Sequence, residues 1–121
     1  MAYITDELSI RRILDHLGLS PPEQERGWFV QPTIFADVDP NMSVAQEEIF
    51  GPVVSIIPAN DFESALAVAN SVGYGLSSSI YTRDLRTAFR YAEESEAGML
   101  HVNIPTVGGE AQVPFGGVKD S

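Results

Sequence analysis

The chain has 121 residues, of which 44% are hydrophobic and 20% charged, as is typical of a small soluble globular domain. Its 17 acidic and 7 basic residues give a net charge of −10, and the basic residues form no cluster, so we expect no binding to nucleic acid. The sequence has no cysteine, which excludes disulfides, thiolate metal sites and a cysteine nucleophile within these residues.

Membrane segments, export signals and metal sites are not indicated either. No apolar run approaches the roughly 20 residues that cross a bilayer, and the N-terminus has no basic region followed by an apolar core. We therefore expect a cytoplasmic protein with no membrane contact. The two histidines, His16 and His101, lie far apart and in no metal-ligand spacing, so we expect no metal site.

The first 26 residues are predicted to form a helix and a linker. Thr5 or Asp6 can cap the helix, Gly18 can end it, and residues 20–26 are polar and contain two prolines. Its apolar residues share one face: Ile10, Ile13, Leu14 and Leu17. A short amphipathic helix of this kind is stable only when it docks on another surface.

The next segment, up to residue 57, is predicted to contain two strands. Residues 28–35 are apolar with β-branched and aromatic side chains, and Pro32 indicates an edge strand or a bulge. Residues 37–41 have the composition of a turn, and residues 42–50 fit a short helix or an irregular turn. Residues 53–57 form a continuous apolar run, which predicts a buried strand.

A helix, a strand and a second helix are predicted to follow. Asn60 can cap the first helix with Glu63 completing a capping box, and Gly73 can end it. Its apolar face is Phe62, Ala65, Leu66 and Ala69. Residues 76–81 predict a strand, and Asp84 opens the second helix. The apolar face of the second helix is Leu85, Ala88, Phe89 and Ala92.

Gly98 is predicted to end the second helix. Residues 99–102 are predicted to form a last strand, which is followed by a loop rich in glycine and proline. Strands separated by helices of this length are typical of parallel sheets with crossover connections. We therefore predict an α/β fold: a partial open parallel sheet with crossover helices.

Three segments contain residues suited to binding. Glu47 and Glu48 precede Phe50 and Gly51, so carboxylates that can accept ribose hydroxyl groups stand beside a ring that can pack on a flat ligand. The same pattern is also typical of a solvated acidic turn that stops a helix. In residues 113–119, two glycines follow Phe115 and permit a tight turn that lines a pocket or forms a plain loop.

The third segment is the end of the last predicted strand, where ligands gather in parallel sheets. Asn103 can orient a neighbouring loop through its amide. His101 is a candidate general base, or a structural residue with a satisfied polar neighbour.

Taken together, these segments resemble the aldehyde dehydrogenase superfamily of NAD(P)-dependent enzymes. The resemblance lies in Gly98 and in residues 27–35, 47–53, 69–70, 74–76, 81–85, 102–103 and 114–119, in the family's order and approximate spacing. Residues 27–121 are thus expected to be part of a catalytic domain, and residues 1–26 to be unrelated to it. Residues 10–19 are similar to the tail of certain transposases, and an ordinary N-terminal helix is the alternative.

The resemblance implies roles for four residues. Glu48 matches the carboxylate that hydrogen-bonds the nicotinamide-side ribose of NAD or NADP, and Phe50 matches the aromatic residue beside the nicotinamide ring. Asn103 matches the asparagine ahead of the loop, here residues 104–113, that borders the aldehyde entrance. Phe115 matches an aromatic residue that lines the substrate tunnel.

The family's reaction also needs groups outside the matched region. A cysteine attacks the aldehyde to form a thiohemiacetal, hydride passes to NAD(P), and a glutamate assists hydrolysis of the thioester. That cysteine, that glutamate, the dinucleotide-binding domain and most of the residues that set specificity lie upstream. We therefore assign no catalytic residue and expect a truncated dehydrogenase, inactive alone and a poor binder of NAD or NADP.

Two alternatives remain for the function. The chain is an oxidoreductase subunit completed by another chain, or a non-catalytic module that docks on intact dehydrogenase chains. The sequence stops before the family's final segment, so we expect an exposed sheet edge through which it forms a homo- or hetero-oligomer.

Overall fold

The computed structural model describes residues 30–107 and 111–121 of the chain. They belong to two compact units, Met1–Pro58 and Ala59–Ser121, which are considered separately below. The predicted N-terminal helix and linker, and the first two residues of the predicted strand 28–35, lie outside the described residues. Within the described ranges, no helix is long and apolar enough to cross a membrane.

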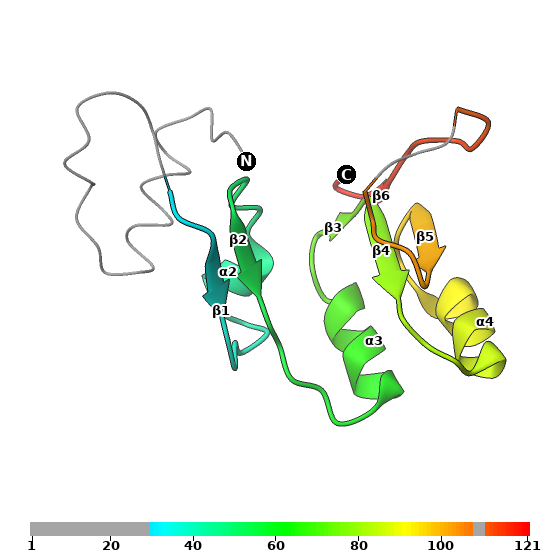
Figure 1. Cartoon of the computed structure of the whole chain (residues 1–121), viewed down its shortest axis with the longest axis horizontal. Coiled ribbons are helices and arrows are strands. Elements are labelled where there is room, and N and C mark those ends of the chain that lie inside the picture. Colours follow the sequence, from blue (N-terminus) through cyan, green and yellow to red (C-terminus); the bar gives the residue numbers. More distant parts are fainter. Residues whose placement is uncertain (1–29, 108–110) are drawn as a thin grey trace. The chain divides into compact units, whose positions relative to one another are not determined.

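The first unit contains two parallel strands and a short helix (Figure 1). They are β1 (Thr33–Phe35), α2 (Ser43–Gln46) and β2 (Val53–Ser55), so the predicted order of strand, short helix and strand is confirmed. Because Pro32 has no N–H group, pairing begins at Thr33, whose N–H donates to the carbonyl of Pro52 over 2.8 Å.

One face of this strand pair is exposed, contrary to the prediction of a buried strand at residues 53–57. Val54 is 57% exposed and Ile56 51%, while Ile34, directly opposite Val54, is 69% exposed. Among residues 30–58, Val38 and Ile49 are the buried apolar side chains. Side chains alternate along a strand, so a run of apolar residues supplies two apolar faces, and the described residues cover only one of them.

The second unit has two helices and two strand pairs. The helices are α3 (Phe62–Asn70) and α4 (Leu85–Glu94), and the strands are β3 (Tyr74–Gly75), β4 (Ser77–Ile80), β5 (Met99–Val102) and β6 (Val118–Lys119). β4 and β5 are parallel and joined through α4, which confirms the predicted α/β fold with a crossover helix. β3 and β6 form an antiparallel pair that the sequence did not predict.

The helix ends differ from the prediction at three of four places. Asp61, not Asn60, caps α3, and Ser64 rather than Glu63 completes the capping box: the Asp61 carboxylate accepts from the Ser64 N–H over 2.7 Å. α3 ends at Asn70, before Gly73, and α4 ends at Glu94, before Gly98, because serines follow both helices and close them. Asp84 caps α4 as predicted.

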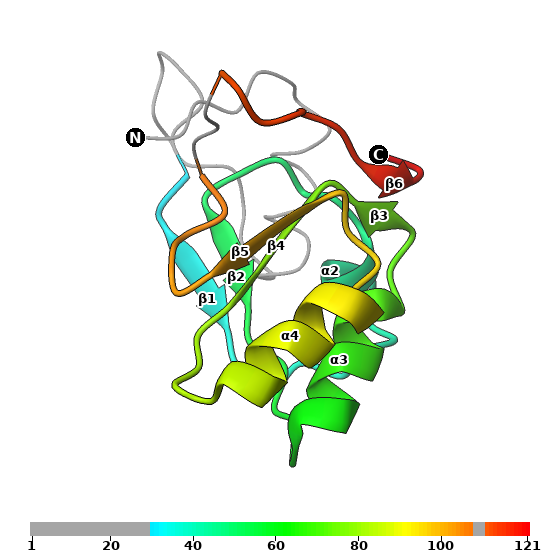
Figure 2. The same cartoon turned by 90° about the vertical axis from the view of Figure 1, so that its right-hand side faces the viewer.

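The face by which α4 packs also differs from the predicted one. Leu85 is 70% exposed and Phe89 61%, whereas Tyr91 is buried at 4%. On the neighbouring position, Arg90 donates to the Glu63 carboxylate of α3 over 2.6 Å. The Arg90 guanidinium also lies 4.8 Å from the centre of the Phe62 ring, so α4 packs beside α3 (Figure 2).

Candidate functional site

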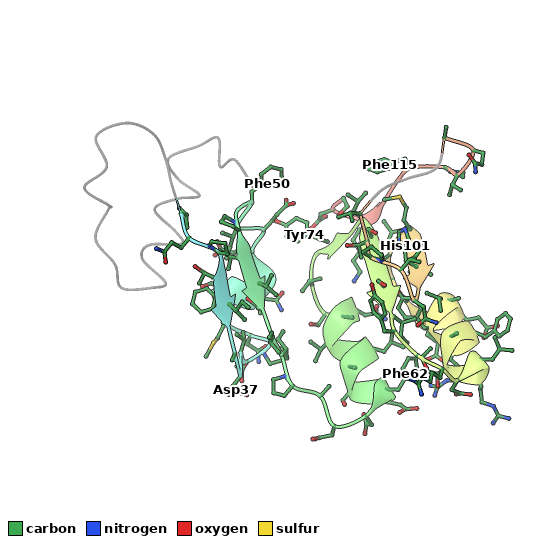
Figure 3. All side chains as sticks on the ribbon, in the orientation of Figure 1. Asp37, Phe50, Phe62, Tyr74, His101 and Phe115 are labelled. Carbon is green, nitrogen blue, oxygen red and sulfur yellow. The ribbon has the colours of Figure 1, made fainter. Side chains whose placement is uncertain are left out.

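The segment that follows α2 places the two predicted cofactor residues on one turn. Ile49 is buried at 8% and anchors the turn, while Glu48 and Phe50 on either side of it are exposed. Phe50 has a φ of 58°, a left-handed conformation that is costly for a residue with a Cβ atom. Its ring is 67% exposed and projects beyond the end of the strand pair where β2 begins (Figure 3).

The chemistry available at this turn is that of a ribose and ring contact. Glu48 makes no hydrogen bond or ion pair to another residue in the described part of the chain, so its carboxylate oxygens are available as acceptors. The exposed Phe50 ring offers a flat apolar surface two positions away. Residues 47–50 therefore fit one end of a nucleotide cofactor.

Asn103 lies at the carboxyl end of β5 in the second unit, where it forms hydrogen bonds to the end of β4 and the residues that follow it. Its backbone N–H donates to the carbonyl of Ile80 over 2.8 Å. Its side chain accepts from the Thr82 N–H over 2.9 Å and donates to the Thr82 carbonyl over 3.0 Å. Asn103 has a φ of 61°, and these bonds hold it there. The amide therefore orients the stretch between β4 and α4.

A shallow pocket of about 450 Å³ lies at this corner, lined by Tyr81, Thr82, Arg83 and Asn103. The start of the loop at residues 104–113 is tied to β4, because the hydroxyl of Ser79 donates to the carbonyl of Ile104 and that of Ser77 to the carbonyl of Thr106. The first residues of this loop therefore run back along β4.

His101 is held as a structural residue. Its Nδ1 lies 3.3 Å from the carbonyl oxygen of Ser78 and 3.4 Å from the hydroxyl of Ser77, and the residue is half-buried on β5 (Figure 3). Its ring therefore has polar neighbours within the chain. This agrees with the structural role that the sequence indicated as the alternative to a general base.

Phe115 is exposed at 76% and stands on the loop before β6 (Figure 3). The backbone that follows it comes close to Gly98, since a Cβ atom added to Gly98 would clash with the carbonyl oxygen of Gly116. Phe115 is therefore near the amino end of β5, whereas Asn103 follows its carboxyl end. The length of β5 therefore lies between the two candidate substrate residues.

Sequence reasoning missed a cluster of three polar side chains, which we call the clasp: Asn70, Glu96 and Lys119. Lys119 Nζ donates to the carbonyl oxygens of Asn70 and Val72 over 2.6 and 3.1 Å, and lies 2.8 Å from a carboxylate oxygen of Glu96. The three residues are far apart in sequence and of types common on surfaces, so no spacing pattern signals them.

The perturbed acidic groups of the second unit lie at the helix starts. Hydrogen bonds from Ser64 and Thr87 hold the pKa of the Asp61 and Asp84 carboxyls below its ordinary value. A hydrogen bond from Arg90 lowers the pKa of Glu63, and the Glu94 and Glu63 carboxylates raise that of Arg90. These shifts belong to helix caps and helix packing, because none of these groups lines the pocket or touches the clasp.

Comparisons with known proteins match nearly the whole chain to one family. The sequence model of the aldehyde dehydrogenase family matches residues 3–121, a stretch that begins earlier than the resemblance we found from motifs at Gly27. The α-ketoglutarate semialdehyde dehydrogenase of Haloferax volcanii is 58% identical over 97 residues, which are 80% of this chain and 20% of that protein.

Solved structures give the same result. The 1-pyrroline-5-carboxylate dehydrogenase from Thermus with bound NAD matches with a TM-score of 0.86 and 35% identity, over 97% of this chain and 25% of that one. The aldehyde dehydrogenase of Mycobacterium tuberculosis complexed with NAD+ matches with a TM-score of 0.81 and 35% identity, over 97% of this chain and 26% of that one. The chain thus spans about a fifth to a quarter of the length of these relatives.

Proposed function

Because the chain belongs to the aldehyde dehydrogenase family, we propose that it supplies part of the catalytic domain of an enzyme that oxidises an aldehyde to a carboxylic acid with NAD or NADP. In this proposal residues 27–121 form that part of the catalytic domain. Glu48 and Phe50 contact the nicotinamide end of the cofactor, and Asn103 and Phe115 border the path of the aldehyde. The thiol nucleophile comes from outside these 121 residues, because they contain no cysteine.

The observation that carries the proposal is the turn at residues 47–50. The buried Ile49 fixes the turn, so that the Glu48 carboxylate and the Phe50 ring both face outward. A carboxylate accepts hydrogen bonds from two neighbouring hydroxyl groups, as a ribose presents them, and the ring packs against a flat heterocycle. When bound, the cofactor accepts hydride at its nicotinamide ring, and the role of these residues is to hold that ring in place.

Binding of NAD to the 121-residue chain tests this role. We expect NAD to bind weakly, with saturation transferred from the protein to the nicotinamide and ribose protons in NMR difference spectra. Glu48→Gln is expected to weaken binding roughly tenfold, since it removes charge-assisted hydrogen bonds. Phe50→Leu is expected to reduce transfer to the nicotinamide protons more than to the ribose protons.

The matched control is Glu93→Gln, which removes the same charge from an exposed position on α4. It is expected to leave NAD binding unchanged. Equal binding by the wild-type chain and the Glu48→Gln variant would contradict the role of Glu48, and the absence of any NAD signal would contradict cofactor binding by this chain. The first aldehyde to test in a reconstituted enzyme carries a carboxylate, because the 58% identical relative acts on α-ketoglutarate semialdehyde.

A second candidate function is docking on another dehydrogenase chain, and the exposed face of β1 and β2 favours it. Ile34, Val54 and Ile56 present adjacent apolar side chains there. Such a face is stabilised when another polypeptide covers it. The covering polypeptide that fits this family is the rest of a dehydrogenase chain. The chain then acts as a subunit completed by a cysteine-bearing partner, or as a non-catalytic module on intact enzyme.

Mixing the chain with a cysteine-bearing aldehyde dehydrogenase separates these two forms. Sedimentation measures complex formation, and NADH production measures turnover. A complex that gains turnover supports the completed subunit, and a complex without gain supports the module. Val54→Lys is expected to abolish the complex, while Val107→Lys, at an exposed valine of the second unit, leaves it intact. No complex under any condition would contradict both forms.

A further inference from the structure

We propose that Lys119 is a positioning residue: through the clasp it fixes the segment of Phe115, Gly116 and Gly117 and thereby sets where the Phe115 ring is presented. The relevance to substrate rests on the proposed role of Phe115 in bordering the aldehyde path. The positioning itself rests on the geometry of the second unit alone.

The Lys119 ammonium has an acceptor for each of its three N–H bonds. They are the carbonyl oxygens of Asn70 and Val72, at 2.6 and 3.1 Å, and the Glu96 carboxylate, at 2.8 Å. The carbonyls belong to the end of α3, where a helix leaves its last carbonyls without partners and favours a cation. The side chain is 21% exposed, so water screens these contacts less than those of a free surface lysine.

Asn70 extends the clasp to the end of α4. Its Nδ2 donates to the carbonyl of Glu94 over 2.9 Å, and its Oδ1 accepts from the N–H of Glu96 over 3.0 Å. The end of α3, the end of α4 and strand β6 therefore meet on three side chains. A displacement of β6 breaks bonds to both helices, so the clasp gives β6 one position.

The backbone of Lys119 adopts a conformation that its side-chain bonds help to hold. Its φ is 56°, a left-handed conformation that glycine adopts without strain and that a residue with a Cβ atom does not. Glycine at this position would relax the backbone but lose all three side-chain contacts. The strained conformation is thus held by the bonds of the ammonium group and by the pairing of Lys119 with Tyr74.

A short segment, residues 116–118, connects β6 to Phe115. The carbonyl of Gly116 lies so close to Gly98 that no Cβ atom fits on Gly98, and Val118 pairs with Gly75. Phe115 itself is 76% exposed, so burial of its own ring does not hold it. Its placement therefore depends on the residues that follow it, and Lys119 is the one among them that contacts both helix ends.

Fluorine NMR of the full chain labelled with 4-fluorophenylalanine tests the proposal. The chain has six phenylalanines, and the Phe115 signal is assigned by its loss in Phe115→Leu. Lys119→Met keeps most of the side chain's length and removes the charge. We expect this variant to shift and broaden the Phe115 signal while the signals of Phe62 and Phe89 stay in place. In Lys119→Arg, we expect the Phe115 signal to have nearly the position and width that it has in the wild-type chain.

Arg86→Met is the matched control, because it removes an exposed cation of the same unit that takes no part in the clasp and does not line the pocket at Asn103. An unchanged Phe115 signal in Lys119→Met would overturn the proposal, and so would an equal change of all six signals, which is the mark of a purely structural role. Should Lys119→Met fail to fold, Glu96→Gln decides, since it replaces the one charged acceptor of Lys119 by a neutral one. It is expected to move the Phe115 signal by less than Lys119→Met and in the same direction, and no movement would overturn the proposal.

A second readout uses the chain's single lysine. Labelled with 15N-lysine, the wild-type chain is expected to show one side-chain ammonium signal protected from exchange with water, and Glu96→Gln is expected to weaken it. Absence of a protected signal would contradict the clasp. Titration with α-ketoglutarate semialdehyde then tests the proposed function separately. A Phe115 signal that responds to Lys119→Met but not to this aldehyde leaves the clasp standing and contradicts the substrate role.

Discussion

The two units of the chain keep their shape by different means. In the first unit, backbone pairing of β1 with β2 and two buried side chains, Val38 and Ile49, hold a turn whose bonds are local. In the second unit, side chains from distant segments bond to backbone groups at strand and helix ends, as Asn103 does to Thr82 and Lys119 to Asn70. The position of the proposed cofactor residues therefore depends on the structure next to them in the sequence. The positions of the proposed substrate residues depend on hydrogen bonds between segments that are distant in the sequence.

Removal of a buried side chain from each unit is the strongest test of this difference. Leu66→Ala in the second unit is expected to cost about 2–5 kcal/mol, because Leu66 is the buried apolar residue of α3. In hydrogen exchange followed by mass spectrometry, amides of β4 and β5 are expected to lose protection while those of β1 and β2 keep theirs. Ile49→Ala is expected to do the reverse. Loss of protection in both units from either variant would show that they unfold together.

The glycine contact of the second unit gives the next largest effect. Gly98→Ala places a methyl group against the carbonyl oxygen of Gly116, and a forced shift of packed backbone costs about 1–3 kcal/mol. Urea unfolding followed by circular dichroism measures this loss. Gly116→Ala is the control, since a Cβ atom there meets nothing within 4 Å. Equal stability of the two variants would show that the Gly98 contact relaxes without cost.

Acid is expected to weaken the helix starts of the second unit. The pKa of the Asp61 and Asp84 carboxyls is lowered in the folded chain by hydrogen bonds from Ser64 and Thr87. A carboxyl with a lowered folded pKa adds stability above its unfolded pKa, about 3.9 for aspartate, and this stability is lost as the pH falls through the folded pKa. Helical circular dichroism is therefore expected to decline below about pH 4.

Asp84→Asn sharpens the acid experiment, because asparagine also caps helices and does not titrate. The variant is expected to retain α4 at neutral pH and to show a smaller decline in acid. An acid response identical to that of the wild-type chain would assign the decline to other carboxyl groups.

The smallest effect on folding is expected at the exposed face of the first unit. Val54→Thr replaces a side chain that is 57% exposed, so the free energy of unfolding is expected to change by no more than about 0.5 kcal/mol. Solubility is expected to rise, because the apolar face becomes smaller. Light scattering against concentration measures it. A large loss of stability instead would show that Val54 is packed in the chain in solution.

Much of the fold was predictable where one local signal sufficed. The strand at residues 99–102 and the cap at Asp84 follow directly from an apolar run and a capping side chain. The packing face of α4 did not follow from its apolar repeat, because the side chain buried on this helix is Tyr91, which lies outside that repeat. The pairing of β3 with β6 escaped prediction because each strand has two residues, and their partner is more than 40 positions away.

The candidate site divides in the same manner. Glu48 and Phe50 were predicted, and their outward placement on one turn depends on Ile49 between them, a pattern visible over three residues. Lys119 was noticed only as the end of a glycine-containing segment. Asn70 and Glu96 come close to Lys119 only when both helices have folded, so no local sequence pattern predicts these contacts.

The clasp also has a consequence for the chemical reactivity of the chain. Lys119 is its single lysine, and lysine amines condense with aldehydes to form imines. That condensation needs access to the nitrogen, whereas the Lys119 Nζ has three oxygen atoms around it and belongs to a side chain only 21% exposed. We therefore expect Lys119 to react with an added aldehyde more slowly than the fully exposed lysine of a short peptide.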